Sequence, residues 1–566
     1  MTETYDVIVI GSGACGGWAS MELAQAGIKV LMLEAGAHVS AAEQFHHQCL
    51  YDMEFRGRGR PGLLRRYTGT ERNYRIMLDT VENPYTTSPE TSYRWLRSRC
   101  LGGRTLHWAR AADRMADYEF KAASRDGYGL DWDVTYAEMK PYYDRVESFI
   151  GVSGEVLGLA QFPDGPFLPP MPLNCAESIF TAACKALGWP STHRRLAQLT
   201  RVHNGRPPCH YCGNCVNGCD VGAMFSTISS TLPPALKTGN LTVRTDSVAA
   251  KVRMDHENRA QGVTYIERYS MKPVDVDARF VILAASTLEN TRLLLLSAKG
   301  GLANSSGLLG HYMIDQIAGG GVSGILPKLK GGPARLDDGK SAGITIPNFQ
   351  NIDHASARKD FIRGYVMNAT GGQTEFPEYA VSLPGYGSVW KKEVKSRYVA
   401  QARVWIAGGE MLARKENFME LDPEVKDHWG IPVARIHFTY SDNDRKLMAD
   451  FQQRAEELFR KAGGEMVPAM RRGGPAGFPG GPGSPDGEHG PALSSAIHEV
   501  GTARMSSKPK DGVLNSFCQT HDVPNLYVFG GNAFPSTGDK HPTLTMMALA
   551  ARGCDHLREN AKGRLS

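Results

Sequence analysis

A glycine-rich turn near the start of the sequence constrains the fold of this chain more than any other segment. Its three spaced glycines, in GSGACG, are Gly11, Gly13 and Gly16. An apolar run at residues 5–10 precedes the turn, a helical pattern follows to residue 25, and a second apolar run at 28–33 ends at Glu34. In such a unit the glycines permit a tight turn, close approach of a pyrophosphate and close helix–strand packing. The segment therefore predicts a dinucleotide site with Glu34 on the adenosine ribose, against the alternative of an ordinary glycine turn.

The composition excludes several classes of protein. The 566 residues are 42% hydrophobic and 22% charged, which is ordinary globular usage and excludes a disordered or fibrous chain. The net charge of +5 is small for this length, so we expect no nucleic-acid partner. No apolar run reaches the roughly eighteen residues of a membrane span. The opening MTETYDVIVIG has no basic stretch, cleavage site or twin arginine, so we expect no export signal of its own.

Later segments resume the nucleotide fold and then change character. Apolar runs at 241–252 and 280–285 predict strands, and 288–296 predicts a helix. From about residue 320 to 470, short alternating segments separated by turn residues predict an antiparallel sheet, where we place the substrate domain. Residues 473–490 hold eight glycines and four prolines, which excludes a regular element. We expect a lid over substrate, a strap for another subunit, or a plain linker.

Four of the 11 cysteines lie in one short run, CHYCGNCVNGCD. They are Cys209, Cys212, Cys215 and Cys219, with the spacing C-x2-C-x2-C-x3-C. Thiols this close suit a metal centre better than disulfides, which would be strained. We expect an iron–sulfur cluster, with a structural zinc and unrelated thiols as alternatives. Asp220 stands where bacterial ferredoxins have proline, and no second run exists, so the cluster is either [4Fe–4S] or [3Fe–4S].

Two histidine motifs near the end of the sequence carry the sharpest functional signal. HEVGTARM begins at His498 and DKHPTLTMMALA contains His541, with an apolar strand at 526–529 and then Gly530, Gly531 and Asn532 between them. Together with the N-terminal glycine motif, these segments resemble the glucose-methanol-choline (GMC) family of flavin oxidoreductases. The resemblance also covers GGRTLHW and VILAASTLENTRLLLLS, but not specifically the middle of the chain. It implies bound FAD and catalysis at both histidines, which singly would be read as structural residues.

The resemblance implies a role for each histidine. An alcohol loses its O–H proton to a base while its C–H hydride passes to flavin N5. We assign His498 as the base, whereas His541 would hold the same oxygen and share its developing charge. Pro542 suits the first turn of a helix that starts at Thr543, and the positive end of that helix could stabilise reduced flavin near N1 and O2.

The LGGRTLHW segment should cover the isoalloxazine ring. We expect Gly102 and Gly103 to lie against the cofactor, together with Val248 and Asn532 from later segments. In relatives that resemble pyranose oxidases, a histidine in a T-H-W segment bonds covalently to the flavin. Here Leu106 replaces that threonine, so His107 is expected to contact FAD or substrate, with a covalent link as the alternative.

The predicted fold is α/β (α+β), and the length allows about three to four domain-sized units. The resemblance implies a Rossmann-like FAD-binding domain, a GMC-type antiparallel-sheet substrate domain and an iron–sulfur-binding insertion. We assign the FAD-binding domain to residues 1–150 and 226–320 and, with the catalytic histidines, 495–566. The substrate-side segment is 151–205, the Cys-rich insertion 206–225 and the substrate domain 321–494.

A cluster beside a flavin favours a dehydrogenase over an oxygen-consuming oxidase, because such a cluster takes electrons one at a time. The Cys run, GGRTLHW and YYDRVESFIGVSG resemble catalytic subunits of bacterial glycoside 3-dehydrogenases and, more distantly, gluconate dehydrogenases. This implies a sugar or glycoside substrate, a cytochrome-type acceptor and a small accessory subunit that would carry the chain to the periplasm; a cytoplasmic location is the alternative. Candidate sugar platforms are Tyr379, Tyr386, Trp390 and Trp405. An oxidase with structural zinc and a noncatalytic electron-transfer or scaffold subunit stay open.

Overall fold

The strand–turn–helix–strand unit predicted at the start of the chain is present. The computed structural model describes residues 4–45, 52–56, 62, 66–67, 71–91, 93–333, 339–341, 343–371, 380, 383–466, 493–495 and 497–560. Strand β1 (Thr4–Ile10) leads through the glycine turn into α1 (Ala14–Gln25) and then β2 (Val30–Leu33). Gly11 has φ +99°, and a Cβ there would lie 2.5 Å from the Ala284 carbonyl oxygen. Only glycine allows this backbone conformation and this close approach to the neighbouring strand.

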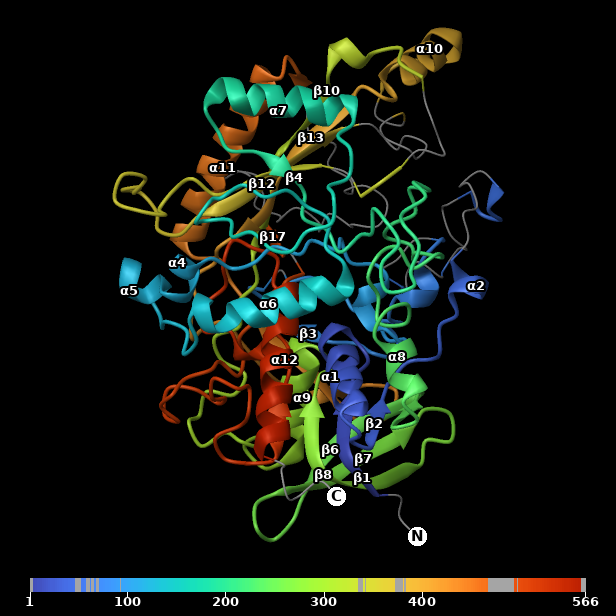
Figure 1. The fold of residues 1–566 in the computed structure, drawn as a ribbon, viewed down its shortest axis with the longest axis vertical. Coiled ribbons are helices and arrows are strands. Elements are labelled where there is room, and N and C mark those ends of the chain that lie inside the picture. Colours follow the sequence, from blue (N-terminus) through green and yellow to red (C-terminus); the bar gives the residue numbers. More distant parts are fainter. Residues whose placement is uncertain are drawn as a thin grey trace.

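A seven-stranded sheet that contains β1 and β2 forms the lower end of the molecule in Figure 1. The strand order is β5-β2-β1-β8-β7-β6, and β18 also pairs with β8. Besides β1 and β2 it contains β5 (Leu241–Arg244), β6 (Ser247–Met254), β7 (Ala260–Glu267), β8 (Pro273–Leu283) and β18 (Leu526–Val528). Strands β5, β2, β1, β8 and β18 run parallel, whereas β6 and β7 are antiparallel additions. Helices α1, α9 (Thr287–Ser297) and α12 (Thr543–Asn560) lie beside this sheet (Figure 1).

The single strand predicted over 241–252 is wrong, because the chain breaks it in two. Strand β5 ends at Arg244 and β6 begins at Ser247, with Asp246 at φ +54° between them. That left-handed residue redirects the chain, so β5 and β6 lie at opposite edges of the sheet. The continuous apolar pattern does not reveal such a break.

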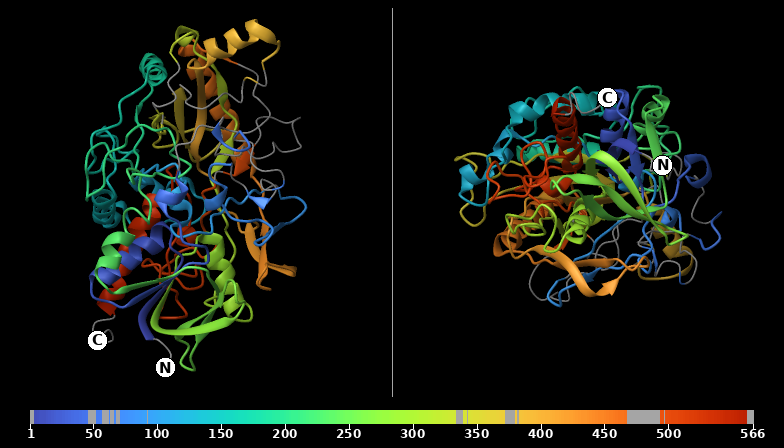
Figure 2. Two further views of the ribbon diagram at one scale, coloured as in Figure 1. Left: turned by 90° about the vertical axis from the view of Figure 1, so that its right-hand side faces the viewer. Right: turned by 90° about the horizontal axis from the view of Figure 1, so that it is seen from below.

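A second, eight-stranded sheet forms the other end of the molecule, as predicted for the substrate domain (Figure 2). Its strands are β4 (Thr192–His193), β9 (Ile317–Gly319), β10 (Val322–Ile325), β11 (Ile344–Ile346), β12 (Tyr365–Gly371), β13 (Gln401–Gly409), β16 (Glu465–Met466) and β17 (Leu493–Ser495). All of their pairings are antiparallel. Helices α7 (Cys175–Leu187) and α11 (Asp442–Lys461) pack on it, and α11 was not predicted. A three-stranded sheet joins β14 (Phe418–Lys426), β15 (Pro432–His437) and β3 (Thr86–Thr87).

The other described helices complete the fold. They are the α-helices α2 (Ala41–Gln44), α4 (Asp117–Phe120), α5 (Ala122–Asp126), α6 (Tyr136–Ile150), α8 (Leu232–Lys237) and α10 (Gly387–Arg397), and the 3-10 helices η2 (Tyr74–Ile76), η3 (Gly103–Leu106), η4 (Pro327–Leu329) and η6 (Gly531–Ala533). One continuous apolar core runs from β1 and β8 into β12, β13 and α11. The two sheets therefore pack as one body, and a site between them has fixed walls.

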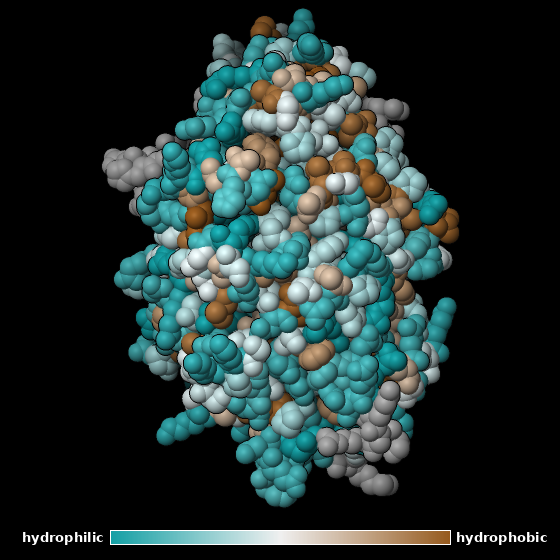
Figure 3. Space-filling model, turned by 60° about the vertical axis from the view of Figure 1, so that its left-hand side comes forward, coloured by the Kyte–Doolittle hydropathy of each residue, from teal (hydrophilic) through white to brown (hydrophobic). Residues whose placement is uncertain are grey.

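The outer surface is largely polar. The face in Figure 3 is mostly hydrophilic, with apolar side chains in small separate groups. In the part of the chain that the structure describes, no helix combines the length and the apolar character that a membrane crossing requires. The predicted glycine–proline loop at 473–490 lies outside the described residues.

Candidate active site

A cavity of about 710 Å³ lies between the two sheets and collects most of the predicted site residues. Its wall includes Gly11, Gly13, Glu34, Gly103, His107, Val248, His498, His541, Pro542 and Thr543. Three predicted cofactor residues do not line it, namely Gly16, Gly102 and Asn532. Cys215 of the cysteine run lies in the same wall. Segments that are distant in the sequence therefore meet at one enclosed site of a size that suits a cofactor.

The N-terminus of α1 opens onto this cavity and fits a pyrophosphate. Gly13 is its N-cap, no side chain caps it, and a Cβ on Gly13 would meet nothing within 4 Å. Unpaired backbone N–H groups at such a helix end attract anions. The buried Glu34 carboxylate accepts hydrogen bonds from Ser12 Oγ at 2.5 Å and from the Gly36 N–H at 2.8 Å. Oε2, the oxygen that accepts from Ser12 Oγ, also accepts from the backbone N–H of Ser12 at 3.2 Å, whereas among the described residues Oε1 has Gly36 alone. Oε1 therefore keeps a second lone pair for a ribose hydroxyl, so the residues fit an adenine dinucleotide such as FAD.

The pairing of β9 with β17 places two polar residues beside His498. Asp315 and Gln316 directly precede β9, and His498 follows β17, whose Ser495 is the register partner of Ile317. The Asp315 carboxylate accepts from the backbone N–H of His498 at 2.9 Å, and Gln316 Oε1 lies 2.7 Å from His498 Nδ1. This dipeptide thus holds both the backbone and the imidazole of His498.

The hydrogen bonds of Gln316 determine which nitrogen of His498 carries the proton. Gln316 Nε2 donates to the carbonyl oxygens of Gly538 at 2.5 Å and Lys540 at 2.7 Å. Both partners can only accept, so the remaining amide atom is the oxygen and His498 must donate to it from Nδ1. In the neutral imidazole Nε2 is then the nitrogen without a proton, and it is available as a base.

His541 is held in a different way. Its Nδ1 lies 3.0 Å from Asp113 Oδ2, so the acceptor is a carboxylate rather than a neutral amide. The ring centroids of His498 and His541 are 5.2 Å apart, with an interplanar angle of 76°. A negative partner supports a positive imidazolium. The two histidines therefore have different partners, a neutral amide for His498 and a carboxylate for His541.

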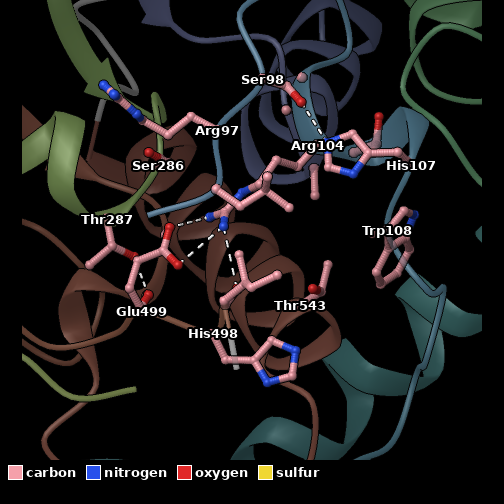
Figure 4. A pocket seen from close by; sticks show the side chains of 18 of the residues that line it. Arg97, Ser98, Arg104, His107, Trp108, Ser286, Thr287, His498, Glu499 and Thr543 are labelled. Atoms are coloured by element: carbon pink, nitrogen blue, oxygen red, sulfur yellow. Dashed lines mark hydrogen bonds and ion pairs between the residues drawn. The ribbon is translucent and has the colours of Figure 1, made fainter. Parts of the chain in front are cut away.

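Positive charge near His498 reinforces this difference. Burial lowers the pKa of His498 well below its usual 6.5, and the charges of His541 and Arg104 lower it further. Arg104 pairs with the buried Glu499 at 2.6 Å (Figure 4). Burial, together with the nearby Glu499, raises the pKa of Asp315 to about 7. The neutral form of His498 is thus the favoured one.

Three further residues that were predicted to contact the cofactor are His107, Gly102 and Asn532. His107 lines the cavity with Nε2 2.5 Å from Ser98 Oγ (Figure 4), and burial lowers its pKa to about 3. The N–H of Gly102 donates to Ser12 Oγ at 2.8 Å. Asn532 donates from Nδ2 to the Thr287 carbonyl oxygen and accepts at Oδ1 from Asn290 Nδ2, so it links η6 to α9.

The four aromatic side chains predicted as sugar platforms separate. Trp405 lines the cavity, whereas Tyr386 is 91% exposed on the surface. Trp390 packs in a small separate cluster around α10, and Tyr379 lies outside the described residues. Of the three that the structure describes, Trp405 alone is therefore placed to contact a substrate.

The cysteine run lies beside the cavity, with Cys215 in its wall. The fully buried Arg110 donates to the Cys215 carbonyl oxygen at 2.6 Å, and its charge faces Cys215 and Cys219. Burial raises the pKa of Cys215 to about 12, so without a metal its thiol stays protonated. Four thiols beside a buried cation suit an anionic metal–sulfur centre. A group compact enough for one ion is His210, Cys212 and Asp220, whose ligand atoms lie within 4.8 Å of one another.

Sequence reasoning missed three residues of the histidine site. Asp113, Asp315 and Gln316 lie far from both histidine motifs along the chain, and no motif marks them. For the last two, the available signal is their position directly before the short strand that pairs with β17.

Comparison with known proteins agrees with this geometry. Two models of one family, both described as GMC oxidoreductase, match residues 6–318 and 413–550. The chain is 28% identical to 2-methyl-1,2-propanediol dehydrogenase of Mycolicibacterium austroafricanum, over 98% of this chain and 95% of the relative. It is also 28% identical to the fructose dehydrogenase large subunit of Gluconobacter japonicus, over 99% of each. A solved formate oxidase covers 99% of each chain with a TM-score of 0.67 at 14% identity, which shows the shared fold.

Proposed function

The chain belongs to the GMC oxidoreductase family, and from that premise we propose that it is an FAD-dependent dehydrogenase that oxidises a secondary hydroxyl of a sugar or glycoside, with C3 as the candidate position, to a ketone. The family, with relatives named as dehydrogenases, makes it a flavin-dependent oxidoreductase of CH–OH groups. The observation that carries the oxidation of a hydroxyl is the pair of imidazoles in one cavity, one held by an amide and the other by a carboxylate. The sugar and the C3 position are supported by relatives named as a fructose dehydrogenase large subunit and a C-glycoside 3-oxidase.

The chemistry follows from the two partners. The substrate hydroxyl loses its proton to Nε2 of His498, the C–H bond breaks with both of its electrons, and the C–O bond becomes C=O. His541, oriented by the contact of its Nδ1 with Asp113, holds the same oxygen and shares the negative charge that grows on it. When bound, FAD supplies the acceptor for the hydride. Gly11, Gly13, Glu34 and the N-terminus of α1 would hold its dinucleotide end, and the start of α12 at Thr543 would face its ring.

We also propose that electrons leave through an iron–sulfur cluster on Cys209, Cys212, Cys215 and Cys219 to a cytochrome-type partner. The position of Cys215 in the cavity wall supports this path, because electrons would have a short distance to travel. When bound, such a cluster supplies a one-electron outlet for a two-electron donor. The fructose relative is named as a large subunit, which supports a small accessory subunit that would export this chain to the periplasm.

One observation favours a second candidate, an oxidase whose cysteine segment holds a structural metal. His210, Cys212 and Asp220 form a group compact enough for a single ion. In that case oxygen would reoxidise the flavin, and the bound metal would be zinc. A covalent flavin link through His107 is compatible with either function.

Anaerobic reduction of the bound flavin by a panel of sugars and glycosides tests the proposal. We expect a sugar to bleach the flavin absorbance, and we expect His498→Ala to retain FAD and slow this step by roughly a hundredfold or more. His541→Ala should slow it less. Iron and acid-labile sulfide analysis separates the cluster from zinc. Wild-type bleaching by simple alcohols with no response to any sugar would refute the substrate class.

A further inference from the structure

The cations that line the cavity are almost all matched by carboxylates. The lining cations are Arg97, Arg99, Arg104, Arg194, Arg292, Lys340 and Arg403. Glu289 faces Arg97 and Arg292, Glu499 pairs with Arg104, and the buried Glu177 pairs with Lys340 at 2.8 Å. Arg99 and Arg194 also have carboxylates nearby. Within the described part of the chain, no carboxylate or hydrogen-bond partner acts on the Arg403 guanidinium, whose charged neighbour is Arg194.

Arg403 is instead held by an aromatic ring. Its guanidinium carbon lies 4.4 Å from the ring centroid of Trp405, two residues further along β13, on the same face of the strand. Arg194 lies 6.0 Å from the same ring. Burial and the positive charge of Arg194 lower the pKa of Arg403 to about 10. A guanidinium stacked on an aromatic ring keeps its N–H edge free for an oxyanion.

The strand register gives the distance of this charge from the reaction site. A Cβ on Gly408 would lie 3.0 Å from Gln316 Oε1, the acceptor of His498, so this end of β13 adjoins the histidines. At about 3.3 Å per residue, the Cα of Trp405 lies roughly 10 Å and the Cα of Arg403 roughly 16 Å from that of Gly408 along the strand, with the guanidinium over the Trp405 ring. One ligand that reaches both the histidines and Arg403 must be longer than a single sugar ring.

We propose that Arg403, stacked on Trp405, is a subsite for a carboxylate on the substrate, so that the preferred substrate is an acidic saccharide with its carboxylate about one sugar unit from the oxidised ring. This inference rests on the proposed sugar oxidation and adds the substrate's charge and length. A half-buried guanidinium such as that of Arg403 is partly removed from water without an anion, which is costly, and a carboxylate binds its planar edge through two parallel hydrogen bonds. Arg110 faces the cysteines instead, so a cluster would leave the charge of Arg403 unmatched.

Matched disaccharide pairs test the proposal. Maltobionate, lactobionate and cellobionate carry a carboxylate at C1 of the open-chain unit, where maltitol, lactitol and cellobiitol carry a hydroxymethyl group. For at least one pair we expect the wild-type kcat/KM of flavin reduction to favour the acid by about tenfold or more, the scale of one charge-assisted hydrogen bond pair. In Arg403→Met we expect this preference to fall toward one. Arg454→Met is the matched control, because Arg454 also lies over a tryptophan ring, 5.9 Å from Trp189, but outside the cavity.

Binding provides a second readout that does not need turnover. The acids should raise the thermal stability of the FAD-loaded wild type and of Arg454→Met, but not that of Arg403→Met, because a ligand stabilises the state that binds it. Two results would overturn the subsite and leave the proposed function standing. In the first, neutral sugars reduce the wild type but no acid is preferred; in the second, Arg403→Met prefers the acids as strongly as the wild type does. Absence of reduction by every sugar, with acid-specific stabilisation retained, would instead refute the oxidation and support the subsite.

Discussion

Gln316 is the residue through which the two histidine segments meet. It accepts from His498 Nδ1 and donates to the carbonyls of Gly538 and Lys540, so one amide ties the base to the residue before His541. A leucine at position 316 keeps the bulk of the side chain but removes the acceptor. Both neutral forms of the imidazole then become populated, and the form with a proton-free Nε2 is less abundant.

We expect Gln316→Leu to slow flavin reduction by about tenfold, the equivalent of one lost hydrogen bond. The loss should be uniform with pH, because an equilibrium between two neutral forms does not depend on pH. Gln350→Leu is the control, since Gln350 is a buried glutamine that bonds Tyr365 and Asp450 instead. Stopped-flow bleaching from about pH 6 to 9 measures the effect, and a loss confined to one end of that range would contradict it.

The low pKa of His498 gives a second expectation. A base works in its unprotonated form, so a pKa below 6.5 keeps His498 active as pH falls. The rate of flavin reduction should therefore decline on the acid side only below pH 6.5. The groups that face it are His541, Arg104, Asp315 and Glu499. Asp315 itself titrates near pH 7, so Asp315→Asn is the comparison. If the rate of flavin reduction already declined on the acid side above pH 6.5, and did so in Asp315→Asn as well, His498 would have an ordinary pKa. Its assignment as the base would then be weakened.

At the scale of elements, two glycines of the β1–α1 turn have different roles, Gly16 in packing of the fold and Gly13 in cofactor binding. A Cβ on Gly16 would lie 1.9 Å from the Gly11 carbonyl oxygen, whereas a Cβ on Gly13 would meet no protein atom within 4 Å. Gly16→Ala should therefore lower both stability and FAD content. Gly13→Ala should lower only the affinity for FAD, because its methyl group points into the expected pyrophosphate site. Thermal unfolding of the apoprotein and FAD titration distinguish them; equal stability losses in both variants would contradict this account.

The elements that the sequence predicted well are those with a local signature. The turn at Gly11, the helix that begins at Thr543 and the alternating strands of the substrate sheet follow from periodicity and glycine chemistry. Helix α11 was missed because a region of strand-like segments surrounds its helical pattern. The partners of the histidines were missed for another reason. Asp113 and Gln316 reach the site through tertiary packing, which a linear motif does not encode.

At the scale of the whole molecule, the cysteine run and the histidines share one cavity, so hydride transfer and electron exit should be separable. In Cys215→Ser we expect iron and sulfide content to fall, substrate bleaching of the flavin to remain, and reduction of added cytochrome c to fall by about tenfold or more, because the outlet lies after the hydride step. Cys175→Ser, at an exposed thiol outside the run, is the control. If the folded Cys215→Ser variant failed to reduce its flavin, the cysteines would be structural and the zinc alternative would gain support.

The strand β18 lies between His498 and His541 in the chain and pairs with β8 of the first sheet. A ribosome adds about 5–20 residues per second, so β1, β2 and the cysteine run emerge well before this strand. The sheet and the pair of imidazoles can form only after nearly the whole chain has been made. An interrupted translation product would therefore possess the four cysteines without the groups that start the reaction, and an unfinished copy of the protein could not oxidise a CH–OH group.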